Sequence, residues 1–222
     1  MHLTPEDHAA VTAAVTAAEA GTNGEIVAVA ARRSDDYHDV ALQFGLLGLT
    51  LALVALAVFP RFGVALEALA FDPWSPRDPR APFAVAAVFA LLVHLLVRLA
   101  MAWMPLRLLV TPRATKTRRV RRRALALFRA SAEKRTTAAT GVLLYLSLDE
   151  HRAELIADEA IHARVPEERW GEAMAALIAA VKDGRPGDGM AAAVGQIGTV
   201  LAAELPRSEG DVNELPDRLI EL

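Results

Sequence analysis

The chain has 222 residues, of which 54% are hydrophobic and 23% charged, and it contains no cysteine. This composition excludes a disordered chain and a wholly membrane-embedded one, and the lack of cysteine excludes disulfides, thiolate catalysis and cysteine-ligated zinc. The net charge of −3 hides a basic block, because residues 107–135 carry eleven Lys or Arg and one Glu within an otherwise acidic chain.

The first part of the chain predicts a helix followed by a strand. Residues 5–20 have Thr4 as a helix cap and Pro5 in the first turn, and glycines follow at 21 and 24. Residues 25–31 (EIVAVAA) are apolar in every position but the first, which is typical of a strand covered by helices on both faces. Residues 1–39 are therefore expected to form the first part of a folded domain.

Two long apolar segments follow, at 40–59 and 81–103, separated by a Pro-rich connector at 60–80. The first has no charge, and as a helix it would span about 30 Å, the thickness of a bilayer's hydrocarbon core. The second is interrupted only by His94 and Arg98, and Arg98 lies near enough to one end to reach the headgroups. We expect a transmembrane hairpin over 40–103; two buried helices of a soluble protein are the alternative.

The basic residues predict the orientation of this hairpin and its surface contacts. They concentrate after the second apolar segment, so the positive-inside rule places both chain ends in the cytoplasm and the connector outside. The polar start MHLTPEDHAA predicts no cleavable signal peptide. We expect a basic juxtamembrane linker at 104–120 and contact with anionic lipid headgroups, rather than nucleic acid, through five arginines. These are Arg118, Arg119, Arg121, Arg122 and Arg123.

The remaining chain predicts the second part of the same domain, over 121–205. A helix at 121–134 precedes apolar strands at 141–148 and 153–157, which a short turn joins as a hairpin. Helices are expected at 166–183 and 190–205, with a glycine-rich connector at 184–189 and a polar tail at 206–222. The fold class is therefore α/β, with a short sheet whose strands come from both sides of the hairpin.

These motifs resemble the TPM-domain family. The segments TNGEIVAVAARRSDD, TGVLLYLSLDEHRAELI and ARVPEERW are similar to family motifs in order and spacing. The resemblance implies a small three-layer domain, and the family includes bacterial membrane proteins and thylakoid-lumen proteins linked to photosystem repair, some termed phosphatases. The chain departs from the family at 158–162, where DEAIH replaces a glycine-rich stretch, and in its membrane hairpin.

Acidic residues after the strands are the candidate ligands for a metal ion. Asp35 and Asp36 follow the strand at 25–31, and Asp149 follows the strand at 141–148. Ligands tend to bind beyond the carboxyl ends of parallel strands, and carboxylates suit Ca²⁺ or Mg²⁺, which the resemblance also permits. The simpler interpretation is that these aspartates end the strands as turn residues.

A second candidate set comprises His151, Asp158, Glu159 and His162, which we expect in exposed loops. Histidine and carboxylate together can ligate zinc, although no HExxH spacing is present. His94 lies within a predicted membrane helix, where a hydrogen bond across the hairpin or to a second copy is the expected role.

The function predicted from these features is binding rather than catalysis. We expect a membrane-tethered assembly or quality-control module at the bacterial inner membrane, with other membrane or envelope proteins as partners. The alternative is a phosphomonoester hydrolase assisted by Ca²⁺ or Mg²⁺ at Asp35, Asp36 and Asp149. A third hypothesis, a small oligomeric transporter, would require His94 or Gln43 to line a pore.

Overall fold

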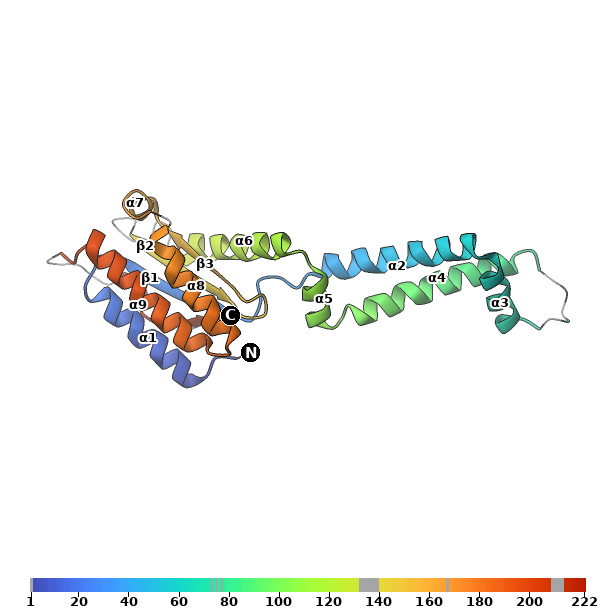
Figure 1. The fold of residues 1–222 in the computed structure, drawn as a ribbon, viewed down its shortest axis with the longest axis horizontal. Coiled ribbons are helices and arrows are strands. Elements are labelled where there is room, and N and C mark those ends of the chain that lie inside the picture. Colours follow the sequence, from blue (N-terminus) through green and yellow to red (C-terminus); the bar gives the residue numbers. More distant parts are fainter. Residues whose placement is uncertain are drawn as a thin grey trace. The chain divides into compact units, whose positions relative to one another are not determined.

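A computed structural model describes residues 2–72, 74, 76, 78–131, 140–166, 168–208 and 214–222. The chain divides into two compact units (Figure 1). The first unit combines Met1–Asp35 with Arg113–Leu222, and the second unit is Asp36–Pro112.

The first unit is built on a mixed four-stranded sheet with strand order β3-β2-β1-β4. Strand β1 (Glu25–Ala31) pairs in parallel with β2 (Gly141–Ser147), although more than a hundred residues separate them in the chain. Strand β3 (Arg152–Ala157) pairs antiparallel with β2, and β4 (Ile220–Glu221) pairs in parallel with β1. The expectation of an α/β fold is confirmed.

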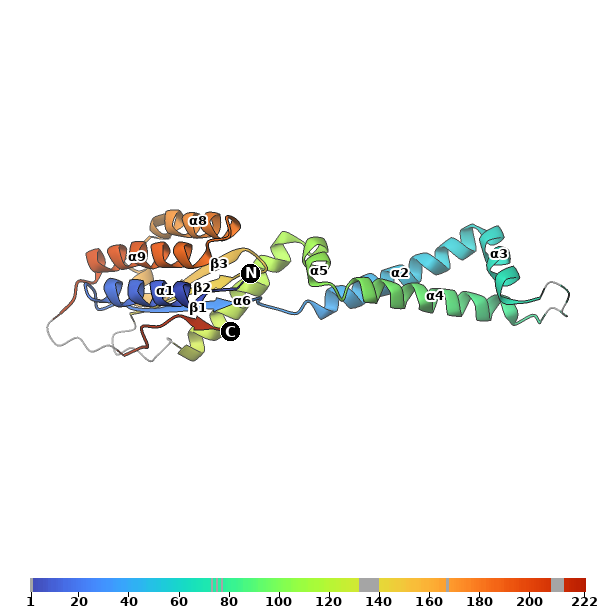
Figure 2. The same cartoon turned by 90° about the horizontal axis from the view of Figure 1, so that it is seen from below.

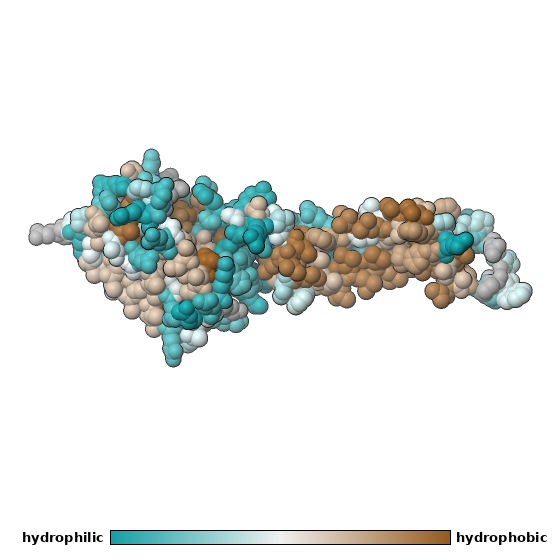
Figure 3. Space-filling view, in the orientation of Figure 1, coloured by the Kyte–Doolittle hydropathy of each residue, from teal (hydrophilic) through white to brown (hydrophobic). Residues whose placement is uncertain are grey.

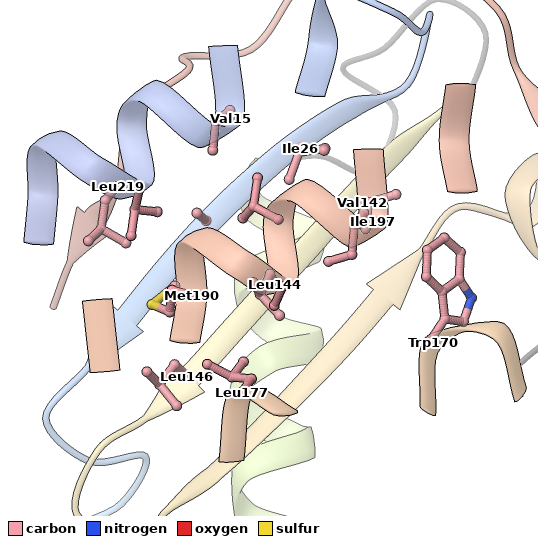
Figure 4. Close-up of a cluster of buried hydrophobic side chains, with 14 of the residues drawn as sticks. Val15, Ile26, Val142, Leu144, Leu146, Trp170, Leu177, Met190, Ile197 and Leu219 are labelled. Atoms are coloured by element: carbon pink, nitrogen blue, oxygen red, sulfur yellow. The ribbon is translucent and has the colours of Figure 1, made fainter. Parts of the chain in front are cut away.

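Helices cover both faces of this sheet (Figure 2). On one face lie α1 (Pro5–Glu19), α8 (Glu168–Lys182) and α9 (Pro186–Glu204), and on the other lies α6 (Arg113–Ser131). Strand β1 shows why its sequence has no polar stripe: Ile26 faces the first set of helices, and Val27 faces α6. Figure 4 shows the larger core, with Leu144 and Met190 between the sheet and α9.

The helix pair α1 and α9 packs unusually closely. A Cβ atom added at Gly198 of α9 would lie 2.4 Å from Cβ of Ala18 on α1.

Thr4 fixes the start of α1 through a capping box with Asp7, in which each side chain accepts a hydrogen bond from the other residue's backbone N–H.

The second unit contains the two apolar helices, α2 (His38–Val58) and α4 (Ala81–Ala100), which pack on each other. Both are long and apolar enough to cross a membrane, with mean hydropathies of 2.2 and 2.4. Their contact depends on glycine, since a Cβ atom at Gly48 would lie 2.9 Å from Val97. Apolar side chains cover the surface of these helices in Figure 3.

Several segments are more ordered than their sequences indicate. The connector at 60–80 contains helix α3 (Pro60–Ala70), and the predicted linker at 104–120 forms α5 (Met104–Val110) and the start of α6. Helix α9 begins at Pro186, inside the stretch 184–189 expected to be a loop, and α7 (Glu159–His162) replaces an expected loop. Proline suits the first helical turn because that position needs no N–H donor, so Pro60 and Pro186 begin helices rather than end them.

Candidate functional site

The carboxyl ends of β1 and β2 lie side by side, as their parallel pairing requires. Ala31 is the register partner of Ser147, where both strands end. The loops beyond them continue the contact: the N–H of Leu148 donates to the carbonyl of Ala31 at 3.0 Å, and that of Asp149 to the carbonyl of Arg32 at 2.8 Å. The loop after β1 and the turn after β2 therefore form one surface.

A buried polar network lies beneath this surface. The Glu150 side chain, only 7% exposed, accepts hydrogen bonds from the Ser34 N–H at 3.0 Å and from the Ser147 hydroxyl. The Ser34 hydroxyl and the Tyr145 hydroxyl are hydrogen-bonded at 3.0 Å. Burial raises the pKa of Tyr145, and the bond with Ser34 opposes that rise. Glu150 thus connects the loop after β1 with the turn after β2. In the sequence it follows Asp149, but its buried position could not be predicted from there.

The three candidate metal ligands have different surroundings. Asp35 forms ion pairs with Arg119 and Arg122 of α6, both at 3.1 Å. Asp149 is half-buried and lies 3.8 Å from Arg32. Asp36 belongs to the second unit, where it is exposed and lies 3.7 Å from His38.

Arginine contact at Asp35 satisfies the carboxylate without a metal ion. Across the described ranges, the structure contains no group of three or more His, Asp or Glu placed to hold a metal ion. Binding of Ca²⁺ or Mg²⁺ by Asp35, Asp36 and Asp149 therefore stays a prediction from sequence. What the geometry does show is a charged contact between the β1 loop and α6.

The second candidate set is divided by strand β3. His151 lies on the turn before β3 and has a left-handed backbone, with φ of 48°. Asp158 follows β3 and accepts a hydrogen bond from the Gly141 N–H at 3.0 Å, immediately before Glu159 and His162 in α7. A strand of six residues separates the two ends by about 20 Å, so His151 does not share a site with the other three.

The five candidate lipid-binding arginines all lie on α6. Arg118, Arg121, Arg122 and Arg123 are exposed, whereas Arg119 is half-buried beside Asp35. The opposite face of the helix carries Val120, Ala124 and Phe128 into the core. Helix α6 thus combines an apolar face against the sheet with a strongly basic outer face.

A groove runs along the edge strand β3 and was not anticipated from sequence. It encloses about 510 Å³ between α6 and α8, with β3 between them. Within it, burial raises the pKa of Glu154, and the charges of Arg121 and Arg152 oppose that rise. Two of its lining residues, Phe128 and Trp170, are large aromatics, but the sequence alone does not show that they lie on either side of an edge strand.

The fold defines a class of protein: an α/β domain with helices on both faces of a mixed sheet, assembled from two segments that flank a pair of long apolar helices. A family model described as the TPM domain matches residues 104–200. The resemblance seen in the sequence is thereby confirmed over this part of the chain, which is less than half of its length.

The fold also resembles a solved structure, the NMR structure of the BA42 protein from the psychrophilic bacterium Bizionia argentinensis. The TM-score is 0.57 at 17% sequence identity, and the alignment covers 100% of this chain and 97% of that one. At this identity the likeness supports the fold alone. No curated protein matches the chain significantly.

Proposed function

We propose that the protein is a membrane-tethered binding module of the bacterial inner membrane, with its TPM domain on the cytoplasmic side. The observation that carries the proposal is the exposed apolar surface of α2 and α4. Only 22% and 6% of their most apolar windows are buried. A core helix of a soluble protein would instead bury most of such a window.

The side chains that face outward from these helices are large. Leu47 and Leu51 of α2 and Leu95 and Leu96 of α4 are each more than half exposed. Fully burying one such leucine side chain contributes about 1.5–3 kcal/mol, so water is an unfavourable surrounding for the pair as it stands. A bilayer provides the apolar surrounding, and the two helix lengths of 21 and 20 residues match its hydrocarbon thickness of about 30 Å.

The basic face of α6 supports the same assignment. It follows the second apolar helix closely in the chain, and cationic residues at this position attract anionic lipid headgroups by about 1 kcal/mol each near the surface. Arg118, Arg121 and Arg123 provide this attraction, while Arg119 and Arg122 also pair with Asp35.

Binding is favoured over catalysis because the carboxylates at the strand ends already have roles in the fold. Asp35 pairs with arginines and Glu150 accepts two hydrogen bonds. Other membrane or envelope proteins are the proposed partners, engaged by the folded domain and concentrated by its tether.

The experiment is extraction of native membranes with alkaline carbonate, combined with labelling of single cysteines. The chain has no cysteine of its own, so Trp74→Cys in the connector and Glu172→Cys on α8 each give one labelled site. We expect the protein to resist extraction, with Trp74→Cys labelled by an impermeant maleimide from outside and Glu172→Cys labelled only after permeabilisation. Release by carbonate would refute the tether, and the reverse labelling pattern would refute the orientation.

A further inference from the structure

Strand β3 forms an edge of the sheet and is the floor of the groove between α6 and α8. In the part of the chain that the structure describes, its one strand neighbour is β2. The groove wall on the α6 side includes Leu125 and Phe128, and the wall on the α8 side includes Trp170 and Met174. Figure 4 shows Trp170 beside the end of β3, apart from the other labelled core residues.

The pairing register shows which backbone groups of β3 point away from β2. The N–H of Asp158 donates to the carbonyl of Gly141 at 2.9 Å, so this is a hydrogen-bonded position of the antiparallel ladder. Such positions alternate along the strand. By this alternation the N–H and C=O groups of Ala153, Leu155 and Ala157 face outward along the groove, as an edge strand presents them to an added strand.

Space for side chains is available above this edge. A Cβ atom added at Gly171, on the exposed side of α8, would meet nothing within 4 Å. The indole N–H of Trp170 is buried and has no hydrogen-bond partner within the described residues. The groove therefore combines apolar walls and an open position on α8 with the outward backbone groups of β3.

The charge of the rim selects the partner. Arg121 and Arg129 line the groove together with one carboxylate, Glu154. A neighbouring hollow on α6 continues the basic surface, since it is lined by Arg118, Arg121, Arg122 and Arg129 with no acidic residue. A bound segment therefore meets a positive edge, which favours acidic side chains.

We propose that the groove along β3 binds an extended acidic segment of a partner protein, which adds to the sheet as a fifth strand. The segment alternates apolar side chains, which enter the groove, with carboxylates, which meet the arginines of α6. This assignment rests on the proposed role as a binding module and names the kind of partner that the module recognises.

The test measures binding of a labelled synthetic peptide that alternates valine and glutamate to the full chain in nanodiscs of phosphatidylcholine, a lipid without net charge. We expect saturable binding that weakens at least about tenfold when alternate peptide nitrogens are methylated, because methylation removes the donors to β3. A peptide with lysine in place of glutamate should also bind more weakly. Absence of saturable binding, or equal binding of the methylated peptide, would overturn strand addition.

Matched variants of the protein locate the binding. Gly171→Leu fills the open position and should weaken binding about tenfold, whereas Gly171→Ala leaves the space and should not. Ala153→Pro removes one outward N–H and should weaken binding, while Ala153→Val retains it. Equal affinity of the two Gly171 variants would place the peptide elsewhere. A dimer in the wild type that Gly171→Leu dissociates would assign the groove to a second copy and overturn the partner proposal.

The experiments test peptide binding at the groove and membrane anchoring by α2 and α4 independently of each other. A chain that resists carbonate but binds no peptide refutes only the groove. A chain that carbonate releases, yet that binds the peptide through Gly171-sensitive contacts, refutes only the tether.

Discussion

The contact between α1 and α9 gives a sharp prediction, because two glycines of α9 lie in opposite environments. At Gly198 an added Cβ would lie 2.4 Å from Cβ and 2.9 Å from Cα of Ala18. At Gly195, less than one turn away, an added Cβ would meet nothing within 4 Å. The same substitution, glycine to alanine, should therefore change stability in opposite directions at the two positions.

The magnitudes follow from two terms. Alanine in a helix is favoured over glycine by about 0.8–1.0 kcal/mol, a gain that both variants share. Carbon atoms in contact normally lie about 3.5–4.0 Å apart, so Gly198→Ala must displace α1 by about 1 Å. Ala18 cannot rotate away, and overpacking of this kind costs about 1–3 kcal/mol, here at the upper end. We expect Gly198→Ala to destabilise the domain by about 1–2 kcal/mol and Gly195→Ala to stabilise it by nearly 1 kcal/mol.

Urea unfolding of the purified full chain in detergent measures the difference, with the fluorescence of Trp170 as the signal of the first unit. Trp74 and Trp103 are changed to phenylalanine in all samples, so that Trp170 is the remaining tryptophan. A Gly198→Ala protein as stable as the Gly195→Ala protein would show that α1 and α9 do not pack as closely as the structure places them.

Three other predictions concern polar groups of the same unit. Burial, together with the nearby charges of Asp217 and Glu25, raises the pKa of Glu19 from 4.5 to about 8, against the opposing hydrogen bond from the Ile26 N–H. Between about pH 5 and 8 the folded state therefore keeps a proton on Glu19 that the unfolded chain has lost, so the free energy of unfolding should fall as pH rises through this range. Glu19→Gln should reduce this pH dependence in unfolding curves. An unchanged pH dependence would show that Glu19 does not cause it. Asp35→Asn should destabilise the unit by about 1 kcal/mol by removing the partner of half-buried Arg119, and a double-mutant cycle with Arg119→Gln should show that the two effects are not additive. Chelation of Ca²⁺ and Mg²⁺ should leave the wild-type unfolding midpoint unchanged, whereas a lower midpoint would support the metal site predicted from sequence.

Local sequence patterns predict those strands and helices in which each face has the same environment, buried or exposed, along its whole length. The run at 25–31 is apolar on both faces because helices cover both faces of β1, and the run at 141–147 is apolar for the same reason. The sequence predicts the helix at 113–131 in part, as 121–134, because its apolar stripe includes Phe128, and positions 132–134 of that prediction lie outside the described residues. These elements need no knowledge of their neighbours to be recognised.

The candidate site depends instead on pairings between distant residues. From the sequence, Asp35 is predicted as a metal ligand because its neighbours in the chain do not include its partners. The packing of α6 brings Arg119 and Arg122 to it from more than eighty residues away. The tail carries too few apolar residues to indicate a strand, yet Ile220 pairs with Val29 because β1 leaves that edge open to it. The groove along β3 has no sequence motif, because it depends on β3 being at the edge of the sheet, between α6 and α8.

The second unit is inserted between β1 and β2, and this position gives the ion pair of Asp35 a structural role. A parallel pair such as β1 and β2 requires a crossover connection, and here the crossover contains the whole second unit and then α6. The chain leaves the first unit after Asp35 and returns at Arg113. Arg119 lies six residues beyond that return, about 9 Å along the helix, so its ion pair with Asp35 joins the outgoing and returning chains close to both junctions. A domain interrupted by a long inserted unit must keep these two crossings together against motion of the inserted segment. The arginine pairing of Asp35 does this, which explains why an acidic residue in the loop after β1 faces a basic helix.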